Sequence, residues 1–403
     1  MKFKWSPIPW VCFALCVGVM GTALISPLYA LYKEAWHLKT SDISLIYVVY
    51  MAGALASLLF LGRLSNRIGF HKVMQLSLGL TLAGTALSML AWDISSLNVA
   101  RFIVGVASSL MTTSASIGLI LLSPKGHPQR TAMLTSFLIA FGFGVGPLMG
   151  GIMGEWLPHP LIMTYVPTIL LTGMGIYALR RIAIPAHAQV SKNPTQTTTT
   201  HWKEWLPQLT WPQASDSSAF VLTTCCAFLA FGVFGLYASM SPLFLEKMVT
   251  WHGPFVSGSA IAAILLLSAG VQLLAGRLST RWCGLWGLLT LALCNGILLL
   301  NLCFGSALLF ALGLVTTAVG HGMCMLAGMH MVNRIAQPHN RAGLLATYFV
   351  IGYIGSMAPM LGIGWVADHW GLKFAVSVFC YSVMAISSVT ALCFFRHPRI
   401  RAD

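Results

Sequence analysis

His321 lies close to the middle of a long apolar run and has a side chain whose ordinary pKa is near neutrality. It stands about 21 Å from the start of the run 307–332, at the 1.5 Å rise per residue of an α-helix. An imidazole with an ordinary pKa of about 6.5 changes its charge in the physiological range. The placement predicts a proton site or a substrate contact, and the alternative is a neutral histidine bonded to a neighbouring helix.

Arg101 is the one lysine or arginine inside an apolar run. It lies about one helical turn, roughly 6 Å, from the start of the run 97–121. A charged group inside a membrane span usually faces a cavity or a partner, whereas a long side chain this close to the surface can extend to it. Both readings are open from the residues alone, and the first makes Arg101 a candidate for proton coupling.

The nine acidic residues fall at the ends of apolar runs, in the gaps between them or at the carboxyl terminus. We therefore expect no carboxylate near the middle of a membrane. Glu34 and Asp42, between the first two runs, are secondary candidates for proton binding.

His321, Met325 and Met329 follow each other at intervals of four residues, with Cys324 beside them. This spacing places them on one face of a helix, and imidazole with soft sulfur ligands can bind Cu(I). A methionine stripe in a membrane helix also fills gaps between helices. Packing is the main expectation, so we predict no metal site and keep copper as the alternative.

Other polar side chains inside the runs predict a weakly polar, aromatic-lined cavity. Some of them are expected only to bond across helices. The candidates, besides His321 and Met325, are Tyr47, Tyr50, Ser108, Ser109, Thr112, Thr113, Ser116, Tyr237, Ser239, Gln272, Thr316 and Thr317.

The composition places these residues in a membrane. The chain is 57% hydrophobic and only 8% charged, whereas soluble domains carry about 25% charged residues. Continuously apolar runs favour helices over barrel strands, which alternate. Twelve runs are long enough to span a bilayer, at 10–30, 43–61, 73–91, 97–121, 132–153, 161–179, 218–245, 255–275, 284–304, 307–332, 344–367 and 374–395.

The basic residues indicate the orientation of the spans. If the amino terminus is cytoplasmic, 18 lysines and arginines fall in inner segments and 4 in outer segments. This asymmetry predicts that both termini face the cytoplasm. The membrane that we expect is a bacterial inner membrane. Because the net charge of +14 comes from clusters between the runs, we read it as topology and expect no nucleic-acid partner.

Three short patterns recur at offsets of 212 to 215 residues, which indicates two similar halves of six spans. Six is an even number, so both halves insert in the same direction, with a binding cavity expected between them. We predict an amino-terminal bundle over 1–181, a linker over 182–217 and a carboxyl-terminal bundle over 218–403. The paired patterns are Ser26-Pro27-Leu28-Tyr29 with Ser241-Pro242-Leu243-Phe244, Gly62-Arg63-Leu64-Ser65 with Gly276-Arg277-Leu278-Ser279, and Pro147 and Gly150 with Pro359 and Gly362.

The linker carries Trp202, Trp205, Leu206 and Leu209 at the spacing of one helical face. This spacing suits a short helix on the inner membrane surface. Pro207 interrupts it, so a plain linker is the alternative.

The basic loop Gly62–Lys72 resembles the loop between the second and third helices of the major facilitator superfamily, whose usual form is Gly-x-Leu-x-Asp-Arg-x-Gly-Arg-Lys. Gly62, Leu64, Arg67 and Gly69 match, and Lys72 supplies a base one position late. Asn66 stands where the family usually has an aspartate. That acid joins a charge network which holds one conformation, so the resemblance implies a weaker network here.

Two further motifs support the resemblance. Arg101-Phe102-Ile103-Val104-Gly105 is similar to an Arg-x-x-x-Gly pattern associated in the family with proton coupling, and the run 142–151 to a glycine and proline signature of its antiporters. Glycines at this spacing let helices approach closely, and Pro147 permits a bend, so this span is predicted to be a moving seam, with static packing as the alternative. The predicted conformational residues are Gly62, Asn66, Arg67, Gly69, Lys72, Gly142, Gly146, Pro147, Gly150, Gly151, Gly276, Arg277, Arg281 and Pro359.

The sequence therefore predicts an all-α integral membrane protein with twelve helices in two pseudo-symmetric bundles. The resemblance implies a secondary transporter that works by alternating access, with proton-coupled export of small organic compounds as the main expectation. A copper or metallophore transporter and a non-transporting scaffold or sensor are the alternatives. No nucleotide-binding loop, nucleophile elbow or zinc helix occurs in the sequence. We expect no enzyme activity and no cofactor, and a monomer whose partners are the lipid bilayer, protons and a small-molecule substrate.

Overall fold

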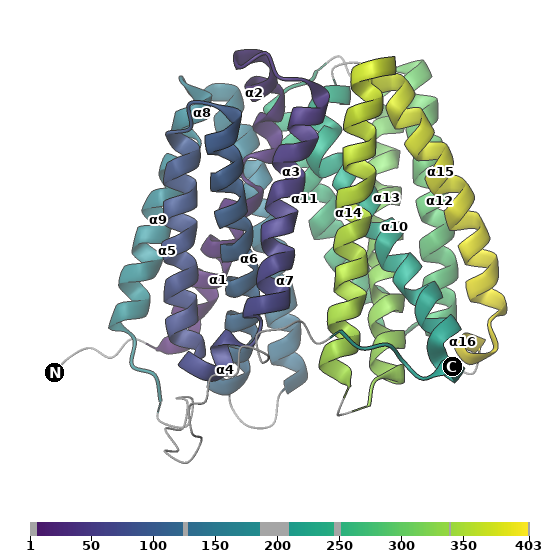
Figure 1. Cartoon of the computed structure of the whole chain (residues 1–403), viewed down its shortest axis with the longest axis horizontal. Coiled ribbons are helices and arrows are strands. Elements are labelled where there is room, and N and C mark those ends of the chain that lie inside the picture. The colour runs from purple at the N-terminus through teal and green to yellow at the C-terminus, as the bar shows by residue number, and fades with distance from the viewer. Residues whose placement is uncertain (1–5, 124–127, 186–208, 246–250, 338–339, 402–403) are drawn as a thin grey trace. The chain divides into compact units, whose positions relative to one another are not determined.

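The computed structural model describes residues 6–123, 128–185, 209–245, 251–337 and 340–401, and its regular elements in these ranges are all helices (Figure 1). Packing divides the chain into two compact units. The first comprises the described residues within 1–24, 49–146 and 161–207, and the second those within 25–48, 147–160 and 208–403. The sequence boundaries at 181 and 218 follow the repeat and stay a prediction.

In the first unit, α5 packs along both α6 and α9 (Figure 1). Leu15, Leu78, Met111 and Leu119 belong to its fully buried core. Its elements are α1 (Pro7–Ala23), the end of α3 (Thr40–Ala56), the π-helical turn Ser57–Leu61, α4 (Leu64–Ile68), α5 (Phe70–Met89), α6 (Ile94–Leu122), the start of α7 (Pro128–Trp156), most of α8 (Pro160–Met163) and α9 (Val166–Arg181).

In the second unit, α12 packs along α13 and α15, and α10 along α13 and α14. Its elements are the turn Ser26–Leu28, α2 (Tyr29–Ala35), the start of α3, the end of α7, α10 (Ala214–Phe244), α11 (Pro254–Leu274), the turn Ala275–Arg277, α12 (Thr280–Phe304), α13 (Ala307–Ile335), α14 (Arg341–Trp370), α15 (Leu372–Arg396) and α16 (Pro398–Arg401).

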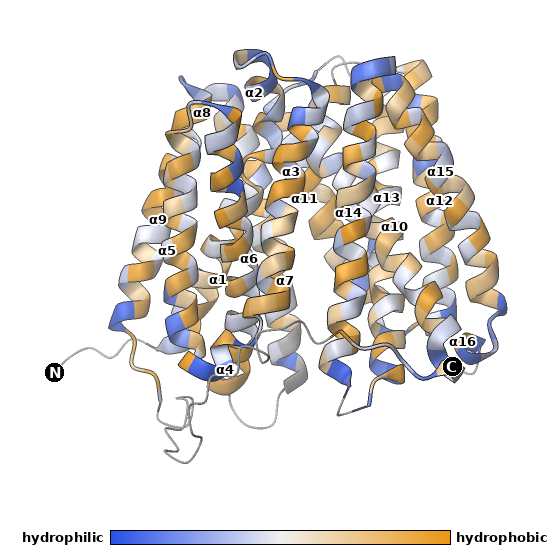
Figure 2. Ribbon diagram, viewed as in Figure 1, coloured by the Kyte–Doolittle hydropathy of each residue, from blue (hydrophilic) through white to orange (hydrophobic). Residues whose placement is uncertain are grey.

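Among the described residues, eleven helices are long and apolar enough to cross a membrane. The remaining expected span, 73–91, corresponds to α5, which has 20 residues but is less apolar. It contains His71, Lys72 and Gln75 near its start, and also a row of buried hydroxyls, in which Ser77 Oγ donates to the Ala107 carbonyl of α6 at 2.7 Å. Figure 2 shows hydrophilic residues gathered mainly at helix ends. The prediction of an all-α membrane protein is confirmed.

The helix bounds reproduce the offset of the sequence repeat. α6 and α13 both have 29 residues, and their starts, Ile94 and Ala307, lie 213 positions apart, as do their ends. α3 and α11 begin 214 positions apart. Side-chain caps mark both starts. At α6, hydrogen bonds from the hydroxyl and amide of Ser96 cap the helix and lower the pKa of Asp93. At α13, the Ser306 hydroxyl accepts a hydrogen bond from the Leu309 amide.

Between α9 and α10, residues 182–185 and 209–213 are not helical. The predicted surface helix at Trp202, Trp205 and Leu206 lies outside the described residues, and only its last member, Leu209, lies inside them.

Candidate functional site

His321 lies at the midpoint of α13, 14 residues from each end of the helix. Its Nδ1 is 2.8 Å from Ser268 Oγ on α11, and its ring lies 5.8 Å from the ring of Phe234 on α10. Gly322 beside it lets the two helices approach, because a Cβ there would lie 2.7 Å from the Ser268 carbonyl oxygen. His321 is therefore half-buried where three helices meet.

The sulfur atoms near His321 pack against aromatic and apolar groups. The Tyr348 hydroxyl lies 3.9 Å from Met325 Sδ, and Met329 packs against a buried cluster that includes Phe220 and Tyr348. In the described part of the chain, no three His, Cys, Asp or Glu side chains gather in a way that could hold a metal ion. These contacts are those of packing side chains, and copper binding by His321, Met325 and Met329 stays a hypothesis.

Arg101 is only 3% exposed, in the first unit. Because α6 begins at Ile94, it lies about 10 Å into the helix, deeper than the sequence run indicates. Its Nη1 donates to the Thr22 carbonyl at 2.9 Å, and its Cζ lies 4.5 Å from the centre of the Tyr50 ring. The side chain does not extend to the surface.

The hydroxyls that follow Arg101 on α6 bond mostly to their own helix. Thr112, Thr113 and Ser116 donate to carbonyls three or four residues earlier, and the Tyr50 hydroxyl lies 3.5 Å from Ser108 Oγ. Serine and threonine commonly do this in membrane helices. These bonds within the helix reduce the free-energy cost of placing hydroxyls inside the membrane. The hydroxyl oxygens keep lone pairs that can accept a further hydrogen bond.

The predicted cavity residues divide between the two units. Tyr237 and Thr317 are buried side chains of α10 and α13, and Tyr47 is joined to Ser356 of α14 by a hydroxyl contact of 2.6 Å. The structure places Tyr50, Ser109, Thr112 and Thr113 in the first unit, and Tyr47, Tyr237, Gln272, Thr317, His321 and Met325 in the second.

Acidic side chains mark helix starts, an arrangement that sequence reasoning missed. In the second unit, Asp368 of α14 accepts from the Thr40 amide at 2.8 Å and from the Ser41 amide at 3.2 Å, at the start of α3. Asp42 accepts from the Lys39 amide at 2.9 Å. A carboxylate is stabilised at such a helix end. Asp42 is thus occupied in capping its own helix, while Glu34 is exposed on α2.

Glu155 repeats this arrangement on α7, because its Oε2 accepts from the Phe255 amide at the start of α11 at 3.3 Å. The signal for both caps was present in the sequence as an acid just past an apolar run, but its partner could not be read from it.

α7 passes from one unit to the other at Gly146 and Pro147. In the first unit, a Cβ on Gly142 or Gly146 would collide with the backbone of α1. In the second unit, a Cβ on Gly151 would lie 2.5 Å from the Pro254 carbonyl oxygen of α11. Gly150 is buried beside it. The glycines therefore serve close packing on both sides of the proline, as the signature indicates, and motion at this seam stays a prediction.

The basic loop contains α4, and Gly69 ends it with φ of 88°, a left-handed conformation that favours glycine. Asn66, Arg67 and Lys72 are exposed, and Gly62 is half-buried. In the second copy, Ser279 has an ordinary φ of −66°, and no atom lies within 4 Å of a Cβ built on Gly276.

The basic residues of that second copy differ in their exposure. Arg277 is exposed, whereas Arg281 Nε donates to the Phe395 carbonyl at 3.1 Å, with its Cζ 3.7 Å from the centre of the Phe395 ring.

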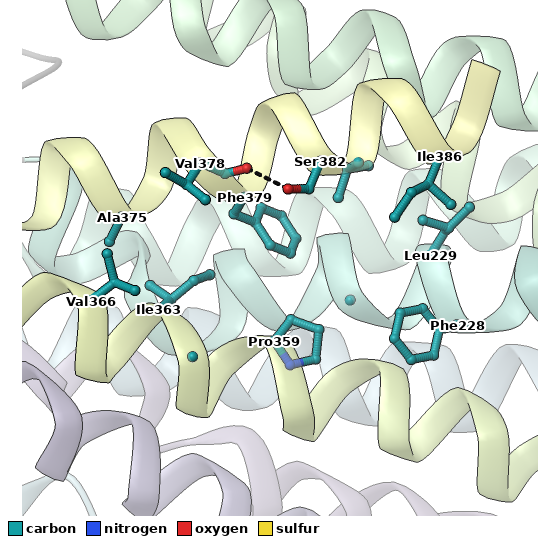
Figure 3. Close-up of a pocket in the computed structure, with 13 residues that line it drawn as sticks. Phe228, Leu229, Pro359, Ile363, Val366, Ala375, Val378, Phe379, Ser382 and Ile386 are labelled. Carbon is teal, nitrogen blue, oxygen red and sulfur yellow. Dashed lines mark hydrogen bonds between the residues drawn. The ribbon is translucent and has the colours of Figure 1, made fainter. Parts of the chain in front are cut away.

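An apolar pocket of about 260 Å³ lies between α10, α14 and α15 (Figure 3). It forms beside Pro359 and Gly362, where α14 has no bulky side chain. Its one hydroxyl, on Ser382, donates to the Val378 carbonyl at 2.8 Å. Val378 and Ile386 are 44% and 48% exposed, as expected for a surface in contact with lipid. The pocket contains no titratable group and none of the polar cavity candidates.

The sequence profile of the Major Facilitator Superfamily matches residues 11–358, which is most of the chain. The chain belongs to the major facilitator superfamily. The resemblance to this superfamily is confirmed, and so is the expectation that the protein is not an enzyme. As a member of this superfamily, the chain is a multi-pass membrane protein.

Two curated superfamily relatives illustrate the distance to known transporters. The riboflavin transporter RibZ of Clostridioides difficile is 22% identical over 163 residues, which is 40% of this chain and 36% of that one. The multidrug efflux protein YfmO of Bacillus subtilis is 27% identical over 145 residues, 36% of each chain. The chain therefore spans about a third of the length of these two curated relatives.

The structural similarity to a solved transporter structure extends over nearly the whole chain. A crystal structure of a bacterial homologue of the human lysosomal transporter Spinster, in an inward-facing and unoccupied conformation, matches with a TM-score of 0.73 at 14% identity. The match covers 98% of this chain and 96% of that one. At this identity the likeness concerns the fold alone, and it confirms the predicted fold of this superfamily.

Proposed function

We propose that the protein is a proton-coupled exporter of small organic compounds that works by alternating access in a bacterial inner membrane, with both termini in the cytoplasm. The observation that carries the coupling is the position of His321. It puts an imidazole, the side chain whose ordinary pKa lies nearest neutrality, at mid-span and within hydrogen-bond distance of a hydroxyl on a second helix.

The Ser268 hydroxyl suits a site that gains and loses a proton. A hydroxyl both donates and accepts, whereas the two nitrogens of a protonated imidazole only donate. Neutral His321 can accept the Ser268 proton at Nδ1, and protonated His321 can donate to the same oxygen. The 2.8 Å contact between Nδ1 and Oγ can thus be kept in both protonation states of His321, although the donor and the acceptor exchange roles. α11 and α13 therefore stay in contact when the charge of His321 changes.

The caps in the second unit support alternating access. Asp368 holds the start of α3 through backbone amides and is itself exposed, so water can replace these bonds. The positive-inside count places this end outside. Such contacts close one end of a pathway reversibly. The similarity to a multidrug efflux protein supports export as the direction of transport. The similarity to a riboflavin transporter means that the relatives do not narrow the class of substrate.

The test combines binding with proton flux. Compounds that raise the melting temperature of the purified protein are added to liposomes containing it and a trapped pH indicator. We expect compound-dependent proton flux, and expect His321→Ala to lower it by about tenfold or more, because the switchable charge at mid-span is gone. His330→Ala, nine residues further along α13, is the matched control. Unchanged flux and pH dependence in His321→Ala would contradict the proposal.

A further inference from the structure

Arg101 is a buried cation whose hydrogen bonds are incomplete. A guanidinium has five N–H donors in a fixed fork, and here one bond is made, from Nη1 to the Thr22 carbonyl. Nε is buried with no hydrogen-bond partner. Burying a charge is unfavourable unless it is paired. The Nε donor of Arg101 is therefore left without an acceptor among the described residues.

No carboxylate of the described residues pairs with Arg101. Asp42, Asp93, Glu155 and Asp368 accept backbone amides at helix starts, Asp216 forms an ion pair of 3.3 Å with Arg399, and Glu34 is exposed on α2. Within the described ranges, the contacts of the Arg101 charge are thus with a carbonyl dipole and an aromatic face.

The Tyr50 ring occupies one side of the guanidinium. Its hydroxyl contact with Ser108 is 3.5 Å long, at the limit of a hydrogen bond. One face of α6 carries Arg101, Gly105 and Ser108, which are spaced by four and then three residues. The Tyr50 backbone packs closely against this face, because a Cβ on Gly105 would collide with the Tyr50 carbonyl. The ring is therefore close to Arg101 by backbone packing but held weakly at its hydroxyl end.

We propose that Arg101 binds the anionic group of the transported compound, so that the substrate is an organic acid that carries a carboxylate. The inference rests on the proposed transport function. Arginine cannot give up its proton in a protein, so its contribution to coupling is to attract negative charge. A carboxylate matches the guanidinium fork with two parallel hydrogen bonds, and on arrival it takes the place of the Tyr50 ring and satisfies Nε.

The test uses probes of one shape and three charges. Benzoate, benzamide and benzamidinium, together with 2-naphthoate and 2-naphthamide, are titrated against the purified full-length protein by tryptophan fluorescence. We expect the carboxylates to bind at least about tenfold more tightly than the amides, because only they complete the ion pair, and benzamidinium to bind most weakly. Arg101→Gln removes this preference.

Arg281→Gln is the matched control. Arg281 makes the same two kinds of contact, with a backbone carbonyl and an aromatic ring, but lies at the start of α12. Its variant should keep the ratio of carboxylate to amide affinity. If Arg101→Gln does not fold, the unaltered protein still decides: equal binding of carboxylate and amide, or no carboxylate binding at millimolar concentration, would overturn the inference.

The two proposals fail separately. Carboxylate binding through Arg101 without compound-dependent proton flux would overturn the coupling and leave the anion site standing. Proton flux driven by neutral or cationic compounds alone would overturn the anion site and leave the coupling standing.

Discussion

α6 and α13 have the same length and the same place in the repeat, yet they carry different kinds of polar group. At the offset of 213, His321 of α13 corresponds to Ser108 of α6, and Arg101 of α6 corresponds to Leu314 of α13. One helix therefore holds a charge that is always present, and its counterpart holds a charge that can be switched. Under the proposed function, α6 would supply a fixed charge and α13 a switchable charge for transport.

The partners of the two residues fit this division. Arg101 bonds to a backbone carbonyl, which can only accept, so that site suits a permanent donor. His321 bonds to a hydroxyl, which can accept or donate, so that site suits both protonation states. We accordingly expect changes at α13 to affect the response to pH and changes at α6 to affect the response to substrate charge.

The largest effect is expected for His321→Asn, which tests whether the response to pH depends on α13. The amide can keep a hydrogen bond to Ser268 but does not titrate, so it separates the proton from the contact. We expect proton-driven transport to fall by about tenfold or more and to lose its dependence on pH, with carboxylate binding unchanged. Flux in liposomes at several pH values, alongside fluorescence titration, measures both. A retained pH profile would show that the switch lies elsewhere.

The sequence was sufficient to predict much of the fold. Continuous apolar runs define helices because a lipid environment forces the backbone to bond within each segment, and the mid-span position of His321 follows from counting residues along one run. The depth of Arg101 was underestimated, at roughly 6 Å instead of about 10 Å, because the capping box at Asp93 and Ser96 starts α6 before the apolar run begins.

The partners of these residues could not be predicted in the same way. Ser268 and His321 are 53 positions apart, Thr22 and Arg101 are 79, and Thr40 and Asp368 are 328. Several of the long described helices, such as α3, α10 and α14, have apolar residues on all sides, so the hydropathy pattern does not select their neighbours. Close approach depends instead on where a glycine removes a side chain, as Gly105 and Gly322 do.

A smaller effect is expected at the aromatic partner of the fixed charge. Tyr50→Leu removes the ring that competes with a carboxylate for Arg101. A cation–π contact contributes about 1 kcal/mol at exposed sites and more when it is buried, as this pair is, so we expect carboxylate affinity to rise by at least about fivefold while amide affinity stays constant. Tyr177→Leu, which removes a ring 5.1 Å from Arg181 at the end of α9, is the matched control. A fall in carboxylate affinity would mean that Tyr50 contacts the substrate itself.

The smallest effect is expected at the hydroxyl partner of the switchable charge. Ser268→Ala removes one neutral hydrogen bond, whose net contribution is about 0.5–1 kcal/mol, and leaves the imidazole able to titrate. Proton-coupled flux should therefore fall by only about twofold to fivefold and should keep its pH dependence. Ser259→Ala, also on α11, is the control within the same helix. If Ser268→Ala abolished the pH dependence as fully as His321→Asn, the hydroxyl would be an obligatory member of the proton path, and α13 alone would not hold the switch.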